Sequence, residues 1–333
     1  MTGAADDDIA ARVRAFVEAG LPGASDVRIA GLTRAPVGRS RENWVFDASW
    51  RQDGVAHAEA LIARRDPPGG LLETDRAVEF AVLRALEGTA IPAPRARWLD
   101  PTGEALGRPS LVMRREEGVC DYFVLNGERP LADRVALARR LCDLLVRIHQ
   151  LDWRAAGLGE VLADPGPDAA RVELAAWEAV VRRDQLEAQP ELEAIAGWLS
   201  RHAPASARTV LVHADFKAGN LLLDGDEIVV LLDWELAHLG DAMEDLGWIT
   251  QPLRRREHLI PGAWERAELF AHYEAAAGVA VDEAAVHWWN VLACYKTAAM
   301  QLSGLGSFVE GRSDELYRPT VTLLRTAFDL IGW

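Results

Sequence analysis

Three oxygen-bearing side chains, those of Asp215, Asn220 and Asp233, follow one another at a spacing that suits phosphate chemistry. Four residues separate Asp215 from Asn220, and twelve separate Asn220 from Asp233. A carboxylate can accept the proton of an attacking hydroxyl, and amide and carboxylate oxygens are ligands of Mg²⁺ when the ion also binds substrate phosphates. The pattern predicts a Mg²⁺-dependent phosphotransferase in which Asp215 is the catalytic base and the other two side chains hold the metal.

Lys217 adds a positive charge to this segment. It is one of only two lysines in the chain, the other being Lys296. Because it follows Asp215 by two residues, its ammonium group could reach the phosphate in transit, and we predict a catalytic role for it. The same order of acid, amide and acid occurs in the catalytic loop of protein kinases. A single H-x-D-x-x-x-x-N string arises often by chance, so the prediction depends on the later acid returning to the same place.

The segment between Asn220 and Asp233 predicts a β-hairpin that would achieve this return. Two apolar runs, 221–223 and 228–232, flank an Asp-Gly-Asp turn at 224–226. Asp-Gly between two strand-like runs favours a tight turn, because glycine adopts a positive φ at little cost. We therefore expect the metal ligands to converge although they are distant in sequence.

The stretch 211–248 resembles the aminoglycoside phosphotransferase family, a branch of the protein-kinase-like fold that modifies small molecules. The catalytic-loop pattern carries the resemblance together with two further strings, LDWELAHLGD at 232–241 and EDLGW at 244–248. The chain is most similar to the subgroup that also occurs fused to acyl-CoA dehydrogenases. The resemblance implies a bilobal α+β fold over nearly the whole chain, and transfer of the γ-phosphate of ATP or GTP to a hydroxyl group.

The resemblance also implies roles for individual residues. Glu235 would be an accessory acid of the metal site, and Asp245 would be structural and bond the backbone of the catalytic loop. Ala214 departs from the family, which usually has glycine at this position. A methyl group is tolerable there if φ is negative.

We expect two lobes, a small β-rich nucleotide-binding lobe at 1–115 and a larger helical, catalytic and acceptor-binding lobe at 116–333. Apolar periodicity in the first lobe predicts a helix at 9–19, strands at 43–50, 55–63 and 111–113, and one main helix at 74–86. Thr74 is the candidate N-cap of that main helix. In the second lobe the same reasoning predicts helices at 131–151, 169–188, 191–202, 263–277, 282–303 and 313–330.

The nucleotide needs a cation in the first lobe, and Arg64 is the candidate. No lysine precedes Lys217, so the strand lysine of protein kinases is absent. A guanidinium group is permanently charged and can hold a phosphate through two parallel hydrogen bonds. Glu79, on the main helix, is the natural carboxylate partner that would orient Arg64. The alternative is an exposed arginine at a strand end and a solvated glutamate.

Two further segments of this lobe are predicted to contact the nucleotide. Ser40 lies in the loop 38–43, which contains one glycine and could touch phosphate, although an ordinary surface turn fits equally well. Beyond Met113 the chain would cross between the lobes, where main-chain groups of Met113 and Arg115 would recognise a purine edge. Main-chain recognition leaves no trace in the sequence, so ATP and GTP are not distinguished. No G-x-x-x-x-G-K-[ST] string occurs, which excludes a P-loop enzyme.

Composition narrows the partners and the compartment. The formal net charge of −15 disfavours nucleic acid, whose phosphates require a basic surface. The first nine residues lack the basic and apolar regions of a signal peptide, and no apolar run of about 18 residues predicts a membrane span. Three widely spaced cysteines without a C-x-x-C string suit a reducing cytosol. We expect a cytoplasmic protein that binds neither nucleic acid nor membrane, and the oligomeric state stays open.

The sequence leaves two chemical classes of acceptor molecule open. The acidic composition could favour a cationic aminoglycoside, whereas the basic run 254–256 could steer an anion such as a CoA thioester. Aromatic residues downstream of the catalytic loop could wall an apolar acceptor or belong to the core: Trp248, Trp264, Trp288, Trp289 and Tyr295. Only a thin acidic pair, at 314–315, lies near the C-terminus, so we favour a hydroxyacyl or other apolar metabolite over an aminoglycoside.

A hypothesis from another class is a catalytically silent pseudokinase that acts as a binding or scaffold module. The missing strand lysine and the poor glycine-rich loop favour it. The complete set of Asp215, Asn220 and Asp233 opposes it, because a silent protein needs no complete metal site.

Overall fold

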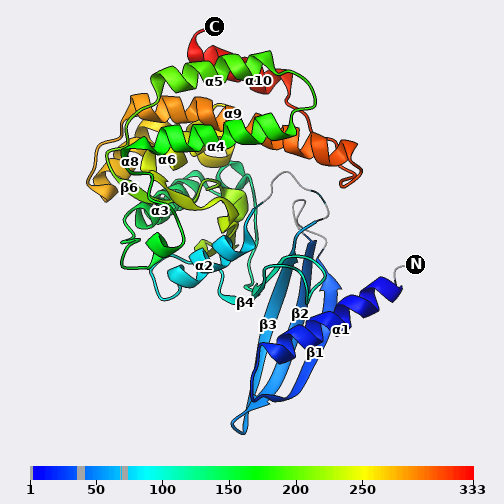
Figure 1. Ribbon diagram of the computed structural model, residues 1–333. Helices are drawn as coiled ribbons and strands as arrows, with labels where there is room; N and C mark the ends of the chain where they lie inside the picture. Colours follow the sequence, from blue (N-terminus) through cyan, green and yellow to red (C-terminus); the bar gives the residue numbers. More distant parts are fainter. Residues whose placement is uncertain (1–2, 36–41, 68, 70–73) are drawn as a thin grey trace.

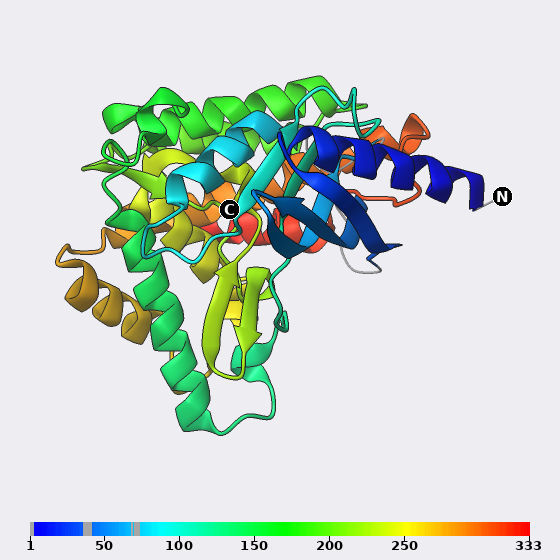
Figure 2. The same ribbon diagram turned by 90° about the horizontal axis from the view of Figure 1, so that it is seen from below.

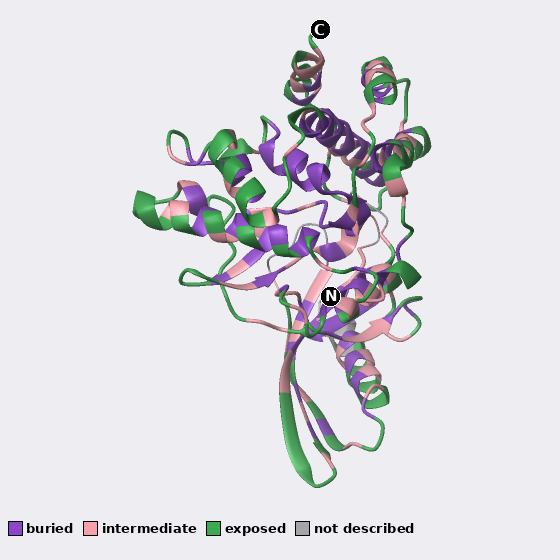
Figure 3. Cartoon of the chain, turned by 90° about the vertical axis from the view of Figure 1, so that its left-hand side faces the viewer, coloured by how far each residue is buried: buried purple, intermediate pink, exposed green. Residues whose placement is uncertain are grey.

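The N-terminal part of the chain is an antiparallel sheet with two helices. The structure is a computed structural model that describes residues 3–35, 42–67, 69 and 74–333. The five strands lie in the order β1-β2-β3-β5-β4. Their bounds are β1 (Ser25–Arg34), β2 (Glu42–Gln52), β3 (Val55–Arg65), β4 (Ala96–Asp100) and β5 (Ser110–Arg114). The pairing of β2 with β3 runs without a break, and the far end of this hairpin is exposed, as the green strands of Figure 3 show.

Helix α1 (Gly3–Ala19) crosses one face of this sheet (Figure 1). Its residues Ile9, Val13 and Val17 recur every four positions and are buried with Phe46 and Leu61 of the sheet. This spacing places them on one side of a helix, and their burial against the sheet supplies most of the attachment. The helix begins before the predicted 9–19, since the prediction followed the apolar positions and the segment 3–8 that precedes them has no apolar periodicity.

Helix α2 (Arg76–Leu86) lies between the sheet and the second lobe. Its N-cap is Asp75, whose carboxylate accepts a hydrogen bond from the Ala77 amide at 2.7 Å. The prediction of Thr74 as the cap is therefore wrong. The Thr74 hydroxyl accepts a hydrogen bond from the Arg76 guanidinium at 3.1 Å instead.

The C-terminal lobe is built from helices around α9. Their bounds are α3 (Leu131–His149), α4 (Ala169–Asp184), α5 (Pro190–His202), α6 (Ala242–Thr250), α7 (Arg255–His258), α8 (Arg266–Ala277), α9 (Glu283–Val309) and α10 (Val321–Ile331). Helix α9 packs against α4, α5, α6 and α10 and contributes much of the buried surface (Figure 1). A sheet-rich N-terminal region followed by a helical region confirms the predicted mixed α+β class.

Two elements of this lobe differ from the expected pattern. The predicted helix 313–330 begins only at Val321, after Thr320 caps it, because Pro319 disfavours a helical residue before it and cannot donate a hydrogen bond. Helix α6 was not predicted. All of its residues are buried, so it lacks the polar face by which an amphipathic helix is recognised.

Short strands carry the catalytic segment into this lobe. Strand β6 (Thr209–Val212) pairs with β9 (His238–Asp241), and the predicted hairpin is formed by β7 (Leu221–Asp224) and β8 (Glu227–Leu231). Figure 2 shows this hairpin beside α3. Within the described part of the chain, no helix is both long enough and apolar enough to cross a membrane.

Candidate active site

The catalytic loop follows β6 and brings Asp215, Lys217 and Asn220 into contact. The Asp215 carboxylate accepts hydrogen bonds from the Lys217 ammonium at 2.5 Å and from the Asn220 amide group at 3.0 Å, both at Oδ2. Burial lowers the pKa of Lys217, but the neighbouring Asp215 carboxylate outweighs this and raises it. Lys217 is therefore cationic at neutral pH beside the predicted base.

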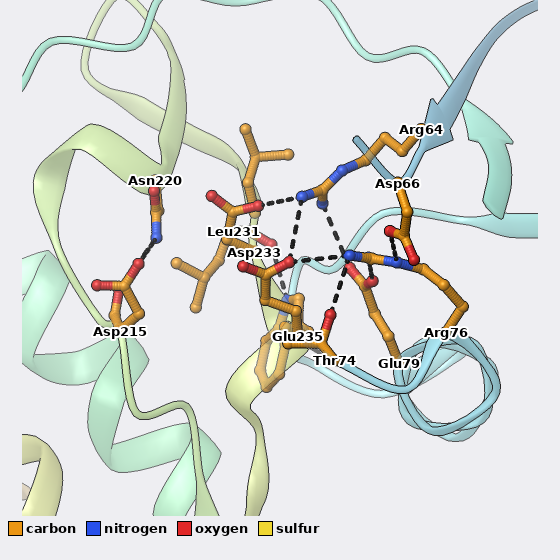
Figure 4. Close-up of polar contacts among 12 residues, drawn as sticks. Arg64, Asp66, Thr74, Arg76, Glu79, Asp215, Asn220, Leu231, Asp233 and Glu235 are labelled. Atoms are coloured by element: carbon orange, nitrogen blue, oxygen red, sulfur yellow. Dashed lines mark hydrogen bonds and ion pairs between the residues drawn. The ribbon is translucent and has the colours of Figure 1, made fainter. Parts of the chain in front are cut away.

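The hairpin returns Asp233 to this loop. The Leu232 amide donates to the Asn220 carbonyl at 2.7 Å, so that the chain before Asp233 is tied to the loop after Asp215. Figure 4 shows Asp215, Asn220 and Asp233 in adjacent loops of the C-terminal lobe. The convergence that the spacing predicts is present, while the roles of the three residues stay predictions.

Arg64 reaches across from β3 and binds the C-terminal lobe (Figure 4). Its guanidinium donates to Glu79 at 3.3 Å and to Asp233 at 2.6 Å. Burial lowers the pKa of Arg64, but the carboxylates of Asp233 and Glu79 raise it by more than burial lowers it. The guanidinium group is therefore permanently charged. Arg64 and Glu79 are only 9% and 2% exposed, which is incompatible with a solvated pair.

Arg76 completes this ion-pair cluster and was missed by sequence reasoning. It is 2% exposed, forms a short ion pair with Glu79, and donates to Asp66 at 2.8 Å and to Glu235 at 3.1 Å. Burial raises the pKa of Glu79, and this rise outweighs the opposite effect of its two arginine partners. Because each arginine lowers the pKa, the second one helps to keep the carboxylate charged. The signal available in the sequence was an arginine one helical turn before Glu79.

Glu235, the implied accessory metal acid, lies in the short 3₁₀ turn Trp234–Leu236. Its carboxylate is 3.1 Å from Arg76 and 3.9 Å from Arg64. In the structure it therefore belongs to the arginine cluster that joins the two lobes. A role at the metal stays a prediction.

Of the three remaining residues predicted to contact the nucleotide, the structure describes two, Met113 and Arg115. Ser40 lies outside the described residues. Met113 is 3% exposed and pairs with Ile62 in the sheet. The Arg115 amide donates to the Ala60 carbonyl at 2.8 Å, so a purine contact from Arg115 would have to use its carbonyl group.

A buried carboxylate holds the start of the catalytic loop. Asp245 accepts hydrogen bonds at 2.9 Å from the amides of His213 and Ala214, and a third contact at 3.1 Å joins it to His149. This confirms the backbone role implied for Asp245. Ala214 does not have the negative φ at which a methyl group would be tolerable. Its φ is +63°, in the left-handed region that disfavours a side chain. The hydrogen bonds that Asp245 accepts help to hold this strained residue.

A second buried cluster lies beneath the loop. His238 is 3.0 Å from Glu244 and 3.7 Å from Glu173, while its Nδ1 donates to the Leu236 carbonyl at 2.9 Å. The Lys296 ammonium is 3.8 Å from Glu244 on the other side. Burial lowers the pKa of His238, but the two carboxylates outweigh it and raise the value to about 10.

This shift makes stability depend on pH. A pKa raised above the unfolded value means that the imidazolium contribution is complete below about pH 6.5 and is lost as pH rises through about 10. We expect the free energy of unfolding to fall between pH 7 and pH 10 by on the order of a few kcal/mol at most, because the His238 side chain is 26% exposed. Urea titrations at several pH values should show a flatter dependence for His238→Gln, and parallel curves would contradict the assignment.

The donor atoms beside the catalytic loop fit a magnesium ion. Asn220, Asp233 and Glu235 offer amide and carboxylate oxygens, the hard ligands that Mg²⁺ prefers. Asp233 already binds a positive charge, that of Arg64, at 2.6 Å. These side chains therefore offer the oxygen ligands that a magnesium ion would require, while the two carboxylates also pair with Arg64 and Arg76.

Comparison with known proteins assigns this chain to a family. Residues 37–289 match the family described as "APH: Phosphotransferase enzyme family". Acyl-CoA dehydrogenase family member 10 of Mus musculus is 31% identical over 56% of this chain and 18% of its own length. Acyl-CoA dehydrogenase family member 11 of Rattus norvegicus is 27% identical over 72% of this chain and 30% of its own length. The chain thus spans less than a third of these two relatives.

Solved structures show the same fold. A Ralstonia eutropha protein described provisionally as an aminoglycoside phosphotransferase has a TM-score of 0.67 and 19% identity, covering 96% of this chain and 94% of its own. The ADP-bound aminoglycoside phosphotransferase APH(2'')-Ib has a TM-score of 0.57 and 13% identity, covering 98% of this chain and 97% of its own. These similarities confirm the bilobal protein-kinase-like fold. The chain therefore belongs to the APH phosphotransferase enzyme family, as the catalytic-loop pattern predicts.

Proposed function

We propose that this protein, a small-molecule kinase by its family, moves the γ-phosphate of ATP or GTP to a hydroxyl group with Asp215 as the catalytic base and Mg²⁺ as the metal. The observation that carries the proposal is the convergence of Asp215, Asn220 and Asp233 opposite Arg64 (Figure 4). Each of these residues comes from a different element or loop position, so their meeting is a property of the fold.

The residues have separate tasks in the proposed reaction. Asp215 orients the acceptor hydroxyl and accepts its proton, while Lys217 and Arg64 supply positive charge to the phosphate in transit. Mg²⁺, when bound by Asn220 and Asp233, neutralises the charge of the nucleotide phosphates. Because the transition state of phosphoryl transfer is loose, position and electrostatics contribute more than strong basicity.

The charged groups around Lys217 balance one another and do not select the charge of the acceptor. Lys217 lies 2.5 Å from Asp215, and Arg254, whose charge acts on Lys217, stacks on Trp248 at 4.5 Å. Each of the two cations is paired with a carboxylate, Lys217 with Asp215 and Arg254 with Glu257 at 3.5 Å, so the preference for a hydroxyacyl or other apolar metabolite rests on the thin acidic pair near the C-terminus. The aromatic residues considered as a pocket wall all belong to the core, since each is at most 3% exposed: Trp248, Trp264, Trp288, Trp289 and Tyr295.

The pseudokinase hypothesis loses its main support. It drew on the missing strand lysine and the poor glycine-rich loop, and the contact of Arg64 with Glu79 supports Arg64 as the replacement for that lysine. A cation held in this way can bind phosphate as a lysine would, with the added option of two hydrogen bonds.

Thermal unfolding with nucleotides tests the proposal. We expect ATP or GTP to raise Tm in the presence of Mg²⁺ and to have little effect in its absence, since a ligand that binds the native state stabilises it. Slow hydrolysis of the same nucleotide should accompany this shift. No response to either nucleotide would support the scaffold instead. Screening hydroxyl compounds by nucleotide consumption, with aminoglycosides and hydroxy acids in parallel, would then identify the acceptor class.

A further inference from the structure

Lys296 is a buried lysine in the middle of α9, the central helix of the C-terminal lobe. Its side chain is 3% exposed. The ammonium group donates a hydrogen bond to the Ala214 carbonyl at 3.0 Å, although the two residues are 82 positions apart. Burial of an ammonium group is costly unless it is paired and bonded, so a lysine at this place requires a reason.

The surroundings of Lys296 balance its charge. Glu244 lies 3.8 Å away, and the aromatic rings of Trp177 and Trp248 lie 5.3 Å and 5.2 Å from the ammonium nitrogen. Glu244 in turn contacts His238, which also faces Glu173. Two carboxylates, one imidazolium and one ammonium leave this network neutral. It therefore needs no additional cation, although its acids and histidine are close enough to surround one.

The carbonyl that Lys296 binds belongs to the strained residue before the catalytic base. Ala214 has a φ of +63°, and its amide is already held by Asp245 at 2.9 Å. Lys296 holds the other end of the same residue. The two contacts together fix both peptide groups of Ala214, and the second of these peptide groups begins Asp215.

We propose that Lys296 is a positioning residue for the catalytic base, which fixes the Ala214–Asp215 peptide and is itself held by the neutral network of Glu173, His238 and Glu244. The inference rests on the proposed function of Asp215. Rotation of this peptide would move the Asp215 Cα and displace its carboxylate from Lys217 and Asn220. Catalysis is sensitive to such displacement, because a shift of about 1 Å can cost on the order of 10²-fold in rate.

The test compares three variants by magnesium-dependent ATP hydrolysis. Lys296→Met keeps the length of the side chain and removes its charge and donor. We expect its kcat to fall about 10- to 100-fold with KM for ATP changed by no more than about twofold, since the nucleotide contacts are elsewhere. Lys296→Arg restores a donor and a charge and should recover a substantial part of kcat. Thr297→Ala is the matched control on the same helix, because its hydroxyl donates to the Ala293 carbonyl of α9 and has no other hydrogen bond among the described residues, and it should keep the wild-type kcat.

Amide hydrogen exchange supplies a readout that does not need activity. The amides of His213 and Ala214 are bonded to the buried Asp245, so exchange in a peptide covering 211–217 reports on the loop. We expect exchange to be at least about tenfold faster in Lys296→Met than in the wild-type protein. The exchange rate in Thr297→Ala should be unchanged. Wild-type exchange together with wild-type kcat in folded Lys296→Met would overturn the inference.

Two further outcomes are covered, an inactive wild-type protein and a Lys296→Met variant that does not fold. If the wild-type protein hydrolyses no nucleotide, the proposed function fails, and exchange alone then supports or overturns the positioning contact. If Lys296→Met shows no cooperative unfolding, Glu244→Gln replaces it. This variant keeps the shape of the glutamate and unbalances the network, so a lower kcat with unchanged KM supports the inference, whereas the wild-type kcat overturns it.

Discussion

Replacement of Asp215 by alanine is expected to lower turnover roughly 10²–10⁴-fold, the usual span for a positioned acid or base. The variant removes the carboxylate that Lys217 and Asn220 hold in place. It leaves the ion pairs of Arg64 with Glu79 and Asp233 intact, and these are the groups proposed to face the nucleotide. Nucleotide binding should therefore be retained while the chemical step is slowed.

The measurement is the steady-state rate with saturating ATP and Mg²⁺, together with calorimetric titration of the nucleotide. Asp224→Ala is a suitable control, because Asp224 is an exposed acid at the end of β7 and lies outside the site. Asp215→Asn separates the loss of the base from the loss of hydrogen bonding within the loop. An Asp215→Ala enzyme with unchanged turnover would exclude Asp215 as the base.

The part of the site that the sequence predicts is the part encoded by short-range patterns. The Asp-Gly turn and its flanking apolar runs specify a hairpin, and the observed register pairs Leu221 with Leu231. This pairing brings Asp233 back to Asn220 by geometry that needs no other part of the chain. Arg64 and Glu79 could be paired because one ends a strand and the other lies on the helix that follows it.

The part that could not be predicted depends on contacts between distant segments. Arg76 reaches Glu235, 159 residues away, and no local pattern records this contact. The left-handed residue Ala214 is likewise bonded by Asp245 and Lys296, both distant in sequence. Local propensity alone disfavours this conformation, so tertiary bonds decide it.

Charged contacts join the two lobes beside a shared apolar core. Arg64 and Arg76 from the N-terminal lobe contact Asp233 and Glu235 from the C-terminal lobe (Figure 4). A metal-bound nucleotide would bind between the same groups, so we expect its phosphates to engage the arginines and its metal to engage the acids. The charged contacts between the lobes are thus the ones that would recognise the nucleotide in the proposed reaction.

This arrangement leads to the second large effect, the loss of magnesium-dependent nucleotide affinity in Asp233→Ala. The variant removes the predicted metal ligand. Contacts to charged groups contribute about 1.5–3 kcal/mol each, so we expect the affinity for ATP with Mg²⁺ to fall about 10- to 100-fold. Arg64 keeps its contact with Glu79 at 3.3 Å and remains able to bind phosphate. The weaker affinity for ATP without Mg²⁺ should therefore be unchanged or slightly increased.

Calorimetric titration of ATP with Mg²⁺ and with EDTA measures both affinities in the same preparation. The expected signature is a large ratio between the two conditions in the wild-type protein and a ratio near one in Asp233→Ala. Asp226→Ala is the control, because Asp226 is an acid of the hairpin turn that pairs with Arg129 at the surface. Equal loss of affinity in both conditions would show that Asp233 acts by holding Arg64, because removal of a metal ligand affects only the magnesium-dependent component.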